Sequence, residues 1–214
     1  MNKDIVKSFS GSNVTLVAVS KTRSAEEILV LYNLGQRDFG ENRVQELMAK
    51  KEELPKDIRW HMIGHLQNNK VKYIAPFIHL IHSVDSLDLY QTIYKEAQKA
   101  GRTIDVLLQF HIAEEETKFG MDYKEAEETI SAYLENKENA VRITGIMAMA
   151  TLTGDESRIR KEFGTLKQYF DMLKEKYFKD EPSFREISMG MSSDYKIAVE
   201  EGSTMVRIGS LLFQ

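Results

Sequence analysis

Short apolar runs and helix-like segments alternate along the whole chain of 214 residues, and this alternation constrains the fold more than any other feature. Eight runs have the apolar, β-branched character of strands buried on both faces, as in parallel sheets. They span residues 14–22, 38–42, 59–65, 79–86, 103–111, 141–150, 185–191 and 205–210. A helix or turn follows each run, so the pattern predicts a single (β/α)₈ TIM barrel of the α/β class, with residues 1–214 as one domain.

The first predicted strand leads into Lys21. A helix begins directly after it, because Ser24 and Glu27 match the Ser-x-x-Glu capping box, and Gly35 ends that helix. Lys21 is therefore predicted at a strand-to-helix corner, where barrels of this kind carry their chemistry. Partial removal from water there would favour the neutral amine that imine formation needs. A lysine that only extends into solvent from a strand end is the alternative, and position alone favours it at least as much.

Charge and composition exclude several classes of partner. The net charge of −4 argues against a surface that coats nucleic acid or binds an acidic membrane. The absence of cysteine excludes disulfides, thiolate metal ligands and a cysteine nucleophile, and it is compatible with a reducing compartment. Residues 1–13 lack the apolar segment of a signal peptide, and no apolar run approaches the roughly 18 residues of a membrane span. We expect a soluble cytoplasmic protein without nucleic-acid or membrane partners.

In a barrel, the residues that follow the strands gather at one end. Here that set comprises Lys21, Asn42, His65, Ser83, the loop 114–120, residues 147–151, Ser192 and residues 207–210. Barrels often bind phosphate with the loops after strands seven and eight, through backbone N–H groups and small side chains. Serines after strand seven and the pair Gly209 and Ser210 after strand eight fit this pattern. Either segment alone is better explained by capping serines or a turn glycine, but together, opposite a lysine, they favour a phosphate site.

The histidines do not predict a metal site. His61 and His65 are four residues apart on one predicted strand, a spacing of about 13 Å, and no zinc-binding helix accompanies them. The five histidines also specify no catalytic triad. Methionines near the strand ends, Met191 among them, are by pattern alone most simply core residues.

Five segments carry a resemblance to a known family. They are Ala18-Val19-Ser20-Lys21-Thr22, residues 40–46 (GENRVQE), residues 61–70 (HMIGHLQNNK), residues 188–194 (SMGMSSD) and residues 206–210 (VRIGS). In this order, over nearly the whole chain, they resemble the pyridoxal phosphate homeostasis protein family. The resemblance implies a barrel similar to the N-terminal domain of alanine racemase, with pyridoxal 5′-phosphate (PLP) held as an imine on Lys21.

The same resemblance implies roles for individual residues. Ser192, Gly209 and Ser210 are expected to bind the phosphate, and Arg207 is expected to approach the pyridine nitrogen. The full set of expected cofactor-binding residues is Lys21, Asn42, Met191, Ser192, Arg207, Gly209 and Ser210. No catalytic residue and no metal ligand is expected.

Two functions from different classes stay open: a PLP-binding protein of vitamin B6 homeostasis, and a PLP-dependent amino-acid racemase. A charged arginine at the ring nitrogen disfavours a protonated ring and so weakens the electron sink, but racemases of similar architecture also use arginine. Those racemases take a second acid/base from a C-terminal domain across a dimer interface, whereas this sequence stops after the eighth strand. The non-enzymatic role is therefore favoured, with PLP stored, buffered or delivered to apo-enzymes by an expected monomer. A barrel that binds another phosphorylated metabolite without an imine is the third alternative, and it would be colourless.

Overall fold

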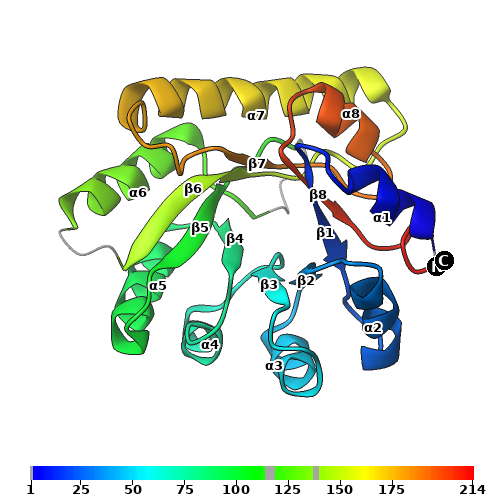
Figure 1. Cartoon of the computed structure of the whole chain (residues 1–214). Helices are drawn as coiled ribbons and strands as arrows, with labels where there is room; N and C mark the ends of the chain where they lie inside the picture. Colours follow the sequence, from blue (N-terminus) through cyan, green and yellow to red (C-terminus); the bar gives the residue numbers. More distant parts are fainter. Residues whose placement is uncertain (1, 114–118, 137–139) are drawn as a thin grey trace.

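The computed structural model describes residues 2–113, 119–136 and 140–214, and within these ranges the chain forms a closed barrel of eight parallel strands. Neighbouring strands follow the chain order, and β8 returns to pair with β1 (Figure 1). The strands are β1 (Thr15–Val19), β2 (Asp38–Glu41), β3 (Arg59–Met62), β4 (Leu80–Val84), β5 (Ile104–Gln109), β6 (Val141–Met147), β7 (Glu186–Ser188) and β8 (Met205–Ile208). The predicted (β/α)₈ barrel is confirmed.

The strands are shorter than the apolar runs that predicted them, chiefly at their carboxyl ends. The run at 185–191 contains only the three residues of β7, and the run at 141–150 ends as a strand at Met147. Met149 and Met191 lie beyond these strands and are half-buried around a cavity at the carboxyl ends. Their apolar character therefore reflects burial at the barrel mouth rather than pairing in the sheet.

Helices surround the barrel (Figure 1). In the described residues they are α1 (Lys3–Phe9), α2 (Ala25–Asn33), α3 (Val44–Glu53), α4 (Asn68–Ile74), α5 (Leu87–Ala100), α6 (Tyr123–Glu135), α7 (Glu156–Tyr177) and α8 (Tyr195–Glu200). The predicted capping box of Ser24 and Glu27 is present at α2, and Gly101 ends α5 in the left-handed conformation. The structure contains no described helix that is long and apolar enough to cross a membrane.

Helix α1 was not predicted, because residues 1–13 are too polar to show a clear apolar face. It completes the ring of helices by lying between α8 and α2 (Figure 1). The backbone N–H of Asn2 donates to the carbonyl of Leu212 at 2.9 Å, so the two ends of the chain lie side by side. Phe9 at the end of α1 contacts the ring of Tyr195 at the start of α8. Helix α1 thus covers the seam where β8 meets β1.

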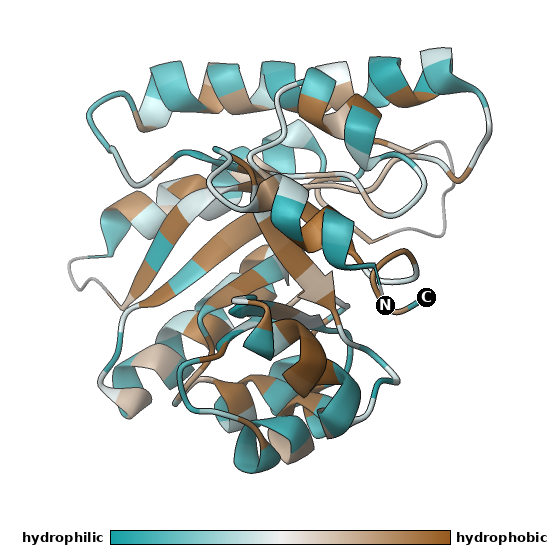
Figure 2. Ribbon diagram, turned by 45° about the vertical axis from the view of Figure 1, so that its right-hand side comes forward, coloured by the Kyte–Doolittle hydropathy of each residue, from teal (hydrophilic) through white to brown (hydrophobic). Residues whose placement is uncertain are grey.

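Strand side chains alternate between the barrel interior and the layer beneath the helices. The outer layer is a large apolar core, and Figure 2 shows apolar strands and outward helix faces that are hydrophilic. The interior holds a small separate apolar cluster of Val17, Leu80, Leu107, Met147 and Met205. Buried polar residues share that interior: Asp38, His61, His82, Ser188 and Arg207. The inside of this barrel is therefore unusually polar for a packed core.

Candidate functional site

A cavity of about 450 Å³ opens at the carboxyl ends of the strands. It is lined by Val19, Lys21, Asn42, Ile63, Met149, Met191, Ser192, Ser193, Arg207, Gly209 and Ser210. All of the residues predicted to bind the cofactor are in this set, although they come from β8 itself and from the loops after β1, β2, β7 and β8. Val19, Ile63, Met149 and Ser193 also line the cavity and were not among the residues predicted to bind the cofactor. Val19 is the last residue of β1, and Lys21 follows in the turn after it.

Lys21 is held at the cavity by an unusual backbone. The next residue, Thr22, has a φ of 61°, which is the left-handed region that β-branched residues avoid. Its N–H donates to Oε2 of Glu46 in α3 at 2.9 Å, which fixes the turn. The Lys21 side chain is exposed, so the partial removal from water expected from sequence is not observed. Any desolvation of this amine must come from what binds in the cavity.

A buried ion pair lies behind the Lys21 corner. The Nζ of Lys50 in α3 donates to Oε1 of Glu41 and to the carbonyl of Ser20, each at 2.7 Å. The Ser20 hydroxyl donates to the same Glu41 oxygen at 2.6 Å. Burial raises the pKa of the fully buried Glu41, while the bonds from Lys50 and Ser20 oppose that rise. Sequence analysis did not identify this pair. Glu41 ends a buried strand, and a charged residue in such a position usually has a buried partner of opposite charge.

Arg207 in β8 forms the wall of the cavity and is only 3% exposed. Its NH1 donates to the carbonyl of Ser188 at 2.8 Å and to the Ser188 hydroxyl at 2.6 Å, and its NH2 donates to the carbonyl of Ala148 at 3.0 Å. Burial lowers the pKa of Arg207 to about 10, so the guanidinium stays charged near neutral pH. Three bonds to two neighbouring strand ends therefore fix a planar cation at the barrel mouth.

The loops after β7 and β8 approach each other closely. A Cβ at Gly209 would lie 3.1 Å from both the Cβ and the carbonyl oxygen of Val19, so glycine lets the end of β8 contact β1. The N–H of Gly209 points at the Ser192 hydroxyl, 3.4 Å away. Ser192 is half-buried and Ser210 is exposed, and both hydroxyls are available to a ligand in the cavity.

Asp194 is the N-cap residue of the short helix α8, but its side chain does not cap that helix. No side-chain cap bond is present there, and Oδ1 of Asp194 instead accepts the N–H of Met191 at 2.6 Å. This bond closes the loop that presents Ser192. Gly190 begins the same loop with a φ of +94°, and a Cβ there would come within 2.5 Å of the Ala198 side chain.

Two other residues of the predicted functional face, His65 and Ser83, do not join the cavity lining. His65 bonds to Asp85 at 2.9 Å and stacks on Phe119. Ser83 is buried inside β4, not at its end, and its hydroxyl finds no partner among the described residues. The loop 114–120 lies outside the described residues except for Phe119 and Gly120.

His61 and His65 have different partners, since His65 bonds to Asp85 whereas His61 bonds to Asp38 and His82. His61 lies near Asp38 and His79, whose potential ligand atoms are within 4.8 Å of one another. Arg59 binds both oxygens of the Asp38 carboxylate, so this cluster is already held by hydrogen bonds and an ion pair.

Comparisons with known proteins identify close relatives. A family model described as the N-terminal domain of alanine racemase matches residues 1–214. A pyridoxal phosphate homeostasis protein of Helicobacter pylori (strain J99) is 41% identical over 205 residues, which is 94% of this chain and 87% of that protein. One from Aquifex aeolicus (strain VF5) is 40% identical over 199 residues, or 92% of this chain and 85% of that protein. The solved structure of PipY from Synechococcus elongatus PCC7942 with PLP bound has a TM-score of 0.88 at 33% identity, and the match covers 99% of each chain.

Proposed function

This chain belongs to the alanine racemase N-terminal domain family, among its pyridoxal phosphate homeostasis proteins, and from that membership we propose that it binds PLP through Lys21 and takes part in PLP homeostasis. The observation that carries the proposal is the single cavity that collects every residue expected to bind the cofactor. Those residues come from separate loops, and an unrelated ligand would not require this combination.

The donor set of the cavity fits PLP. When bound, the group supplies an aldehyde, and the Lys21 amine forms a C=N bond with that carbon while one water leaves. The hydroxyls of Ser192 and Ser210 and the N–H of Gly209 are donors suited to a phosphate. Arg207, fixed by Ser188 and Ala148, would donate to the ring nitrogen. Asn42 and Met191 line the space between these ends.

A carrier role is supported by what the cavity offers for proton transfer. Racemisation moves a proton to and from both faces of a carbon, which needs two positioned acid/base groups. Among the described residues that line the cavity, Lys21 and Arg207 are the only ones with titratable side chains. Arg207 is a poor proton donor because it stays charged. We therefore propose storage, buffering or delivery of PLP, with apo-enzymes as recipients in the cytoplasm, in preference to racemisation.

Removing a hydroxyl that donates to the phosphate should weaken PLP binding by about the free energy of one hydrogen bond. Ser192→Ala and Ser210→Ala should each cost about 1–2 kcal/mol, the scale of one hydrogen bond to a charged group, or about 5- to 30-fold in Kd. A spectroscopic titration with PLP measures this. Ser8→Ala in α1 is the control, because Ser8 is exposed and bonds only to Ile5 of its own helix. An unchanged Kd in the Ser192 and Ser210 double variant would show that the phosphate lies elsewhere.

The choice between carrier and racemase is tested by stereochemistry. Wild-type protein loaded with PLP and incubated with L-alanine should give no more D-alanine than free PLP at the same concentration, measured by chiral chromatography. Free PLP is the control because it racemises amino acids slowly by itself. Turnover above this level that disappears in Lys21→Ala would reject the carrier role in favour of the enzyme.

A further inference from the structure

A continuous chain of hydrogen bonds crosses the barrel interior and ends at Arg207. Asp38 Oδ1 lies 3.0 Å from Nε2 of His61, and Nδ1 of His61 lies 2.9 Å from Nε2 of His82. The Nδ1 of His82 is 2.9 Å from the Ser188 hydroxyl, which also accepts from Arg207 at 2.6 Å. These residues come from β2, β3, β4, β7 and β8 and are all buried. The PLP-binding role proposed above uses only the last of them.

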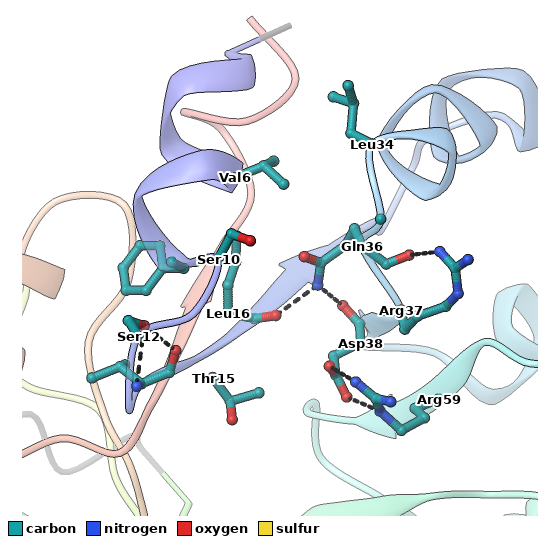
Figure 3. Close-up of a pocket in the computed structure, with 13 residues that line it drawn as sticks. Val6, Ser10, Ser12, Thr15, Leu16, Leu34, Gln36, Arg37, Asp38 and Arg59 are labelled. Atoms are coloured by element: carbon teal, nitrogen blue, oxygen red, sulfur yellow. Dashed lines mark hydrogen bonds and ion pairs between the residues drawn. The ribbon is translucent and has the colours of Figure 1, made fainter.

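The two ends of this chain open on different cavities. Arg207 lines the cavity at the carboxyl ends of the strands. Asp38 and Arg59 line another cavity, of about 260 Å³, at the amino ends of β1 to β3. Figure 3 shows this outer end, where Arg59 grips the Asp38 carboxylate and Gln36 bonds to the backbone of Leu16 and Asp38. These hydrogen bonds therefore link the cavity at the carboxyl ends of the strands to the cavity at their amino ends.

The end at Asp38 determines the direction of the bonds. Although burial alone would raise the pKa of Asp38, hydrogen bonds from Arg59 and His61 hold it well below its usual value, so the carboxylate is ionised and can only accept. His61 must then carry a proton on Nε2. In the neutral form its Nδ1 is bare and accepts from Nε2–H of His82.

The end at Arg207 gives the same direction independently. A guanidinium only donates, so the Ser188 oxygen accepts from it and turns its own proton toward His82. The Nδ1 of His82 is therefore bare, and its one proton is on Nε2. Burial lowers the pKa of His82 well below its usual value, which keeps the ring neutral. Every donor from Arg207 to His61 thus points toward Asp38, with no conflict along the chain.

We propose that Asp38, His61 and His82 form a directional relay that positions the Ser188 hydroxyl against Arg207, and so couples the amino end of the barrel to the PLP cavity. This inference rests on the proposed function. His61, His82 and Ser188 are positioning residues, since none of them lines the cavity.

The relay has a second state. If His61 takes up another proton, both of its nitrogens donate, and Nδ1–H faces Nε2–H of His82. The clash is relieved only if the single proton of His82 moves to Nδ1, where it donates to Ser188, so the whole chain carries one proton more than before. The Ser188 oxygen then accepts from both His82 and Arg207, and its own proton loses its acceptor. The Arg207 contact at the cavity is thereby changed.

His61 is the group placed to switch the relay. It is flanked by the Asp38 carboxylate and Arg59 at the amino end, by His79 against its ring and by His82 on the inner side. His79 is the other titratable ring in contact, and burial lowers its pKa.

Nitrogen NMR of the histidine rings in PLP-free wild-type protein tests the relay directly. At neutral pH the expected state has His61 and His82 protonated on Nε2 only. As the pH is lowered, protonation of His61 should be accompanied by a move of the His82 proton to Nδ1 at the same midpoint. A His82 ring that keeps its proton on Nε2 when His61 becomes charged would overturn the relay.

The coupling to the cofactor is tested by absorption of the PLP-loaded protein. The pH profile of the bound-PLP band should contain a step with the midpoint seen for His82, and His61→Asn should lose that step. His79→Asn is the matched control, because His79 touches the His61 ring but lies outside the chain, and it should keep the step. A profile unchanged in His61→Asn overturns the coupling. The two claims can fail separately. If the protein does not bind PLP but NMR shows the His82 proton moving as described, the proposed PLP-binding function is rejected and the relay is retained.

Discussion

Replacing Lys21 with alanine should abolish the imine band of bound PLP and leave the barrel folded. Lys21 is the only lysine among the described residues that line the cavity, so no neighbouring amine substitutes for it. Its side chain is exposed, and the substitution therefore removes no core packing. Absorption spectra during a PLP titration measure the loss, and the thermal midpoint checks the fold.

The control for this variant is Lys196→Ala. Lys196 is exposed on α8, close in sequence to the Ser192 loop, and it does not line the cavity. This variant should keep the full imine band. Weak noncovalent binding in Lys21→Ala is compatible with the proposal, because the phosphate donors remain. A full imine band in Lys21→Ala would reject Lys21 as the attachment point.

Replacing Lys50 with methionine should lower the free energy of unfolding by about 3–5 kcal/mol, the cost of leaving a buried charge without its partner. Glu41 is fully buried, and its Oε2 has no hydrogen-bond partner among the described residues, so loss of Lys50 leaves only the Ser20 hydroxyl on this carboxylate. Urea unfolding at pH 7.5 measures the change. The Ser20 carbonyl, next to Lys21, also loses the bond from Lys50 and keeps only the one from the Arg23 N–H among the described residues.

The loss should shrink at acid pH. Burial already raises the pKa of Glu41, and removal of Lys50 raises it further. A carboxyl with a raised pKa in the folded state is protonated there before it is in the unfolded chain, so lowering the pH stabilises the variant relative to wild type.

Lys51→Met is the matched control on the same helix. Lys51 forms an ion pair with the largely exposed Glu52 and lies over the Phe77 ring, and partly exposed contacts of these kinds contribute little. A loss in Lys50→Met no larger than in Lys51→Met, or one independent of pH, would contradict the role assigned to the buried pair.

The barrel could be predicted because each of its elements has a local signature. Buried strands produce continuous apolar runs, and helices such as α5 and α7 bury side chains every three or four residues. Helix α1 buries a single residue, Val6, so it has almost no local apolar pattern. It depends instead on contacts with α8 and with the end of the chain, which are far away in the sequence. Its existence could not be read from residues 1–13.

The lining of the cavity was predictable for the same geometric reason, since parallel strands in a closed barrel bring their carboxyl ends together. Ser83 was misplaced because it lies before the last residue of β4, Val84, and is fully buried rather than at the barrel mouth. The relay was not predictable, because the bond from His82 to Ser188 joins residues 106 positions apart. The left-handed backbone of Thr22 also runs against its β-branched preference, so only the fold around it determines that turn.

The most direct test of the account is the site at which PLP becomes attached to the wild-type chain. The protein is incubated with one equivalent of PLP, reduced with borohydride, digested and mapped by mass spectrometry. The account predicts one reduced adduct, on the peptide that contains Lys21. An adduct found mainly on another lysine, or spread over exposed lysines as in an unfolded control, would contradict it.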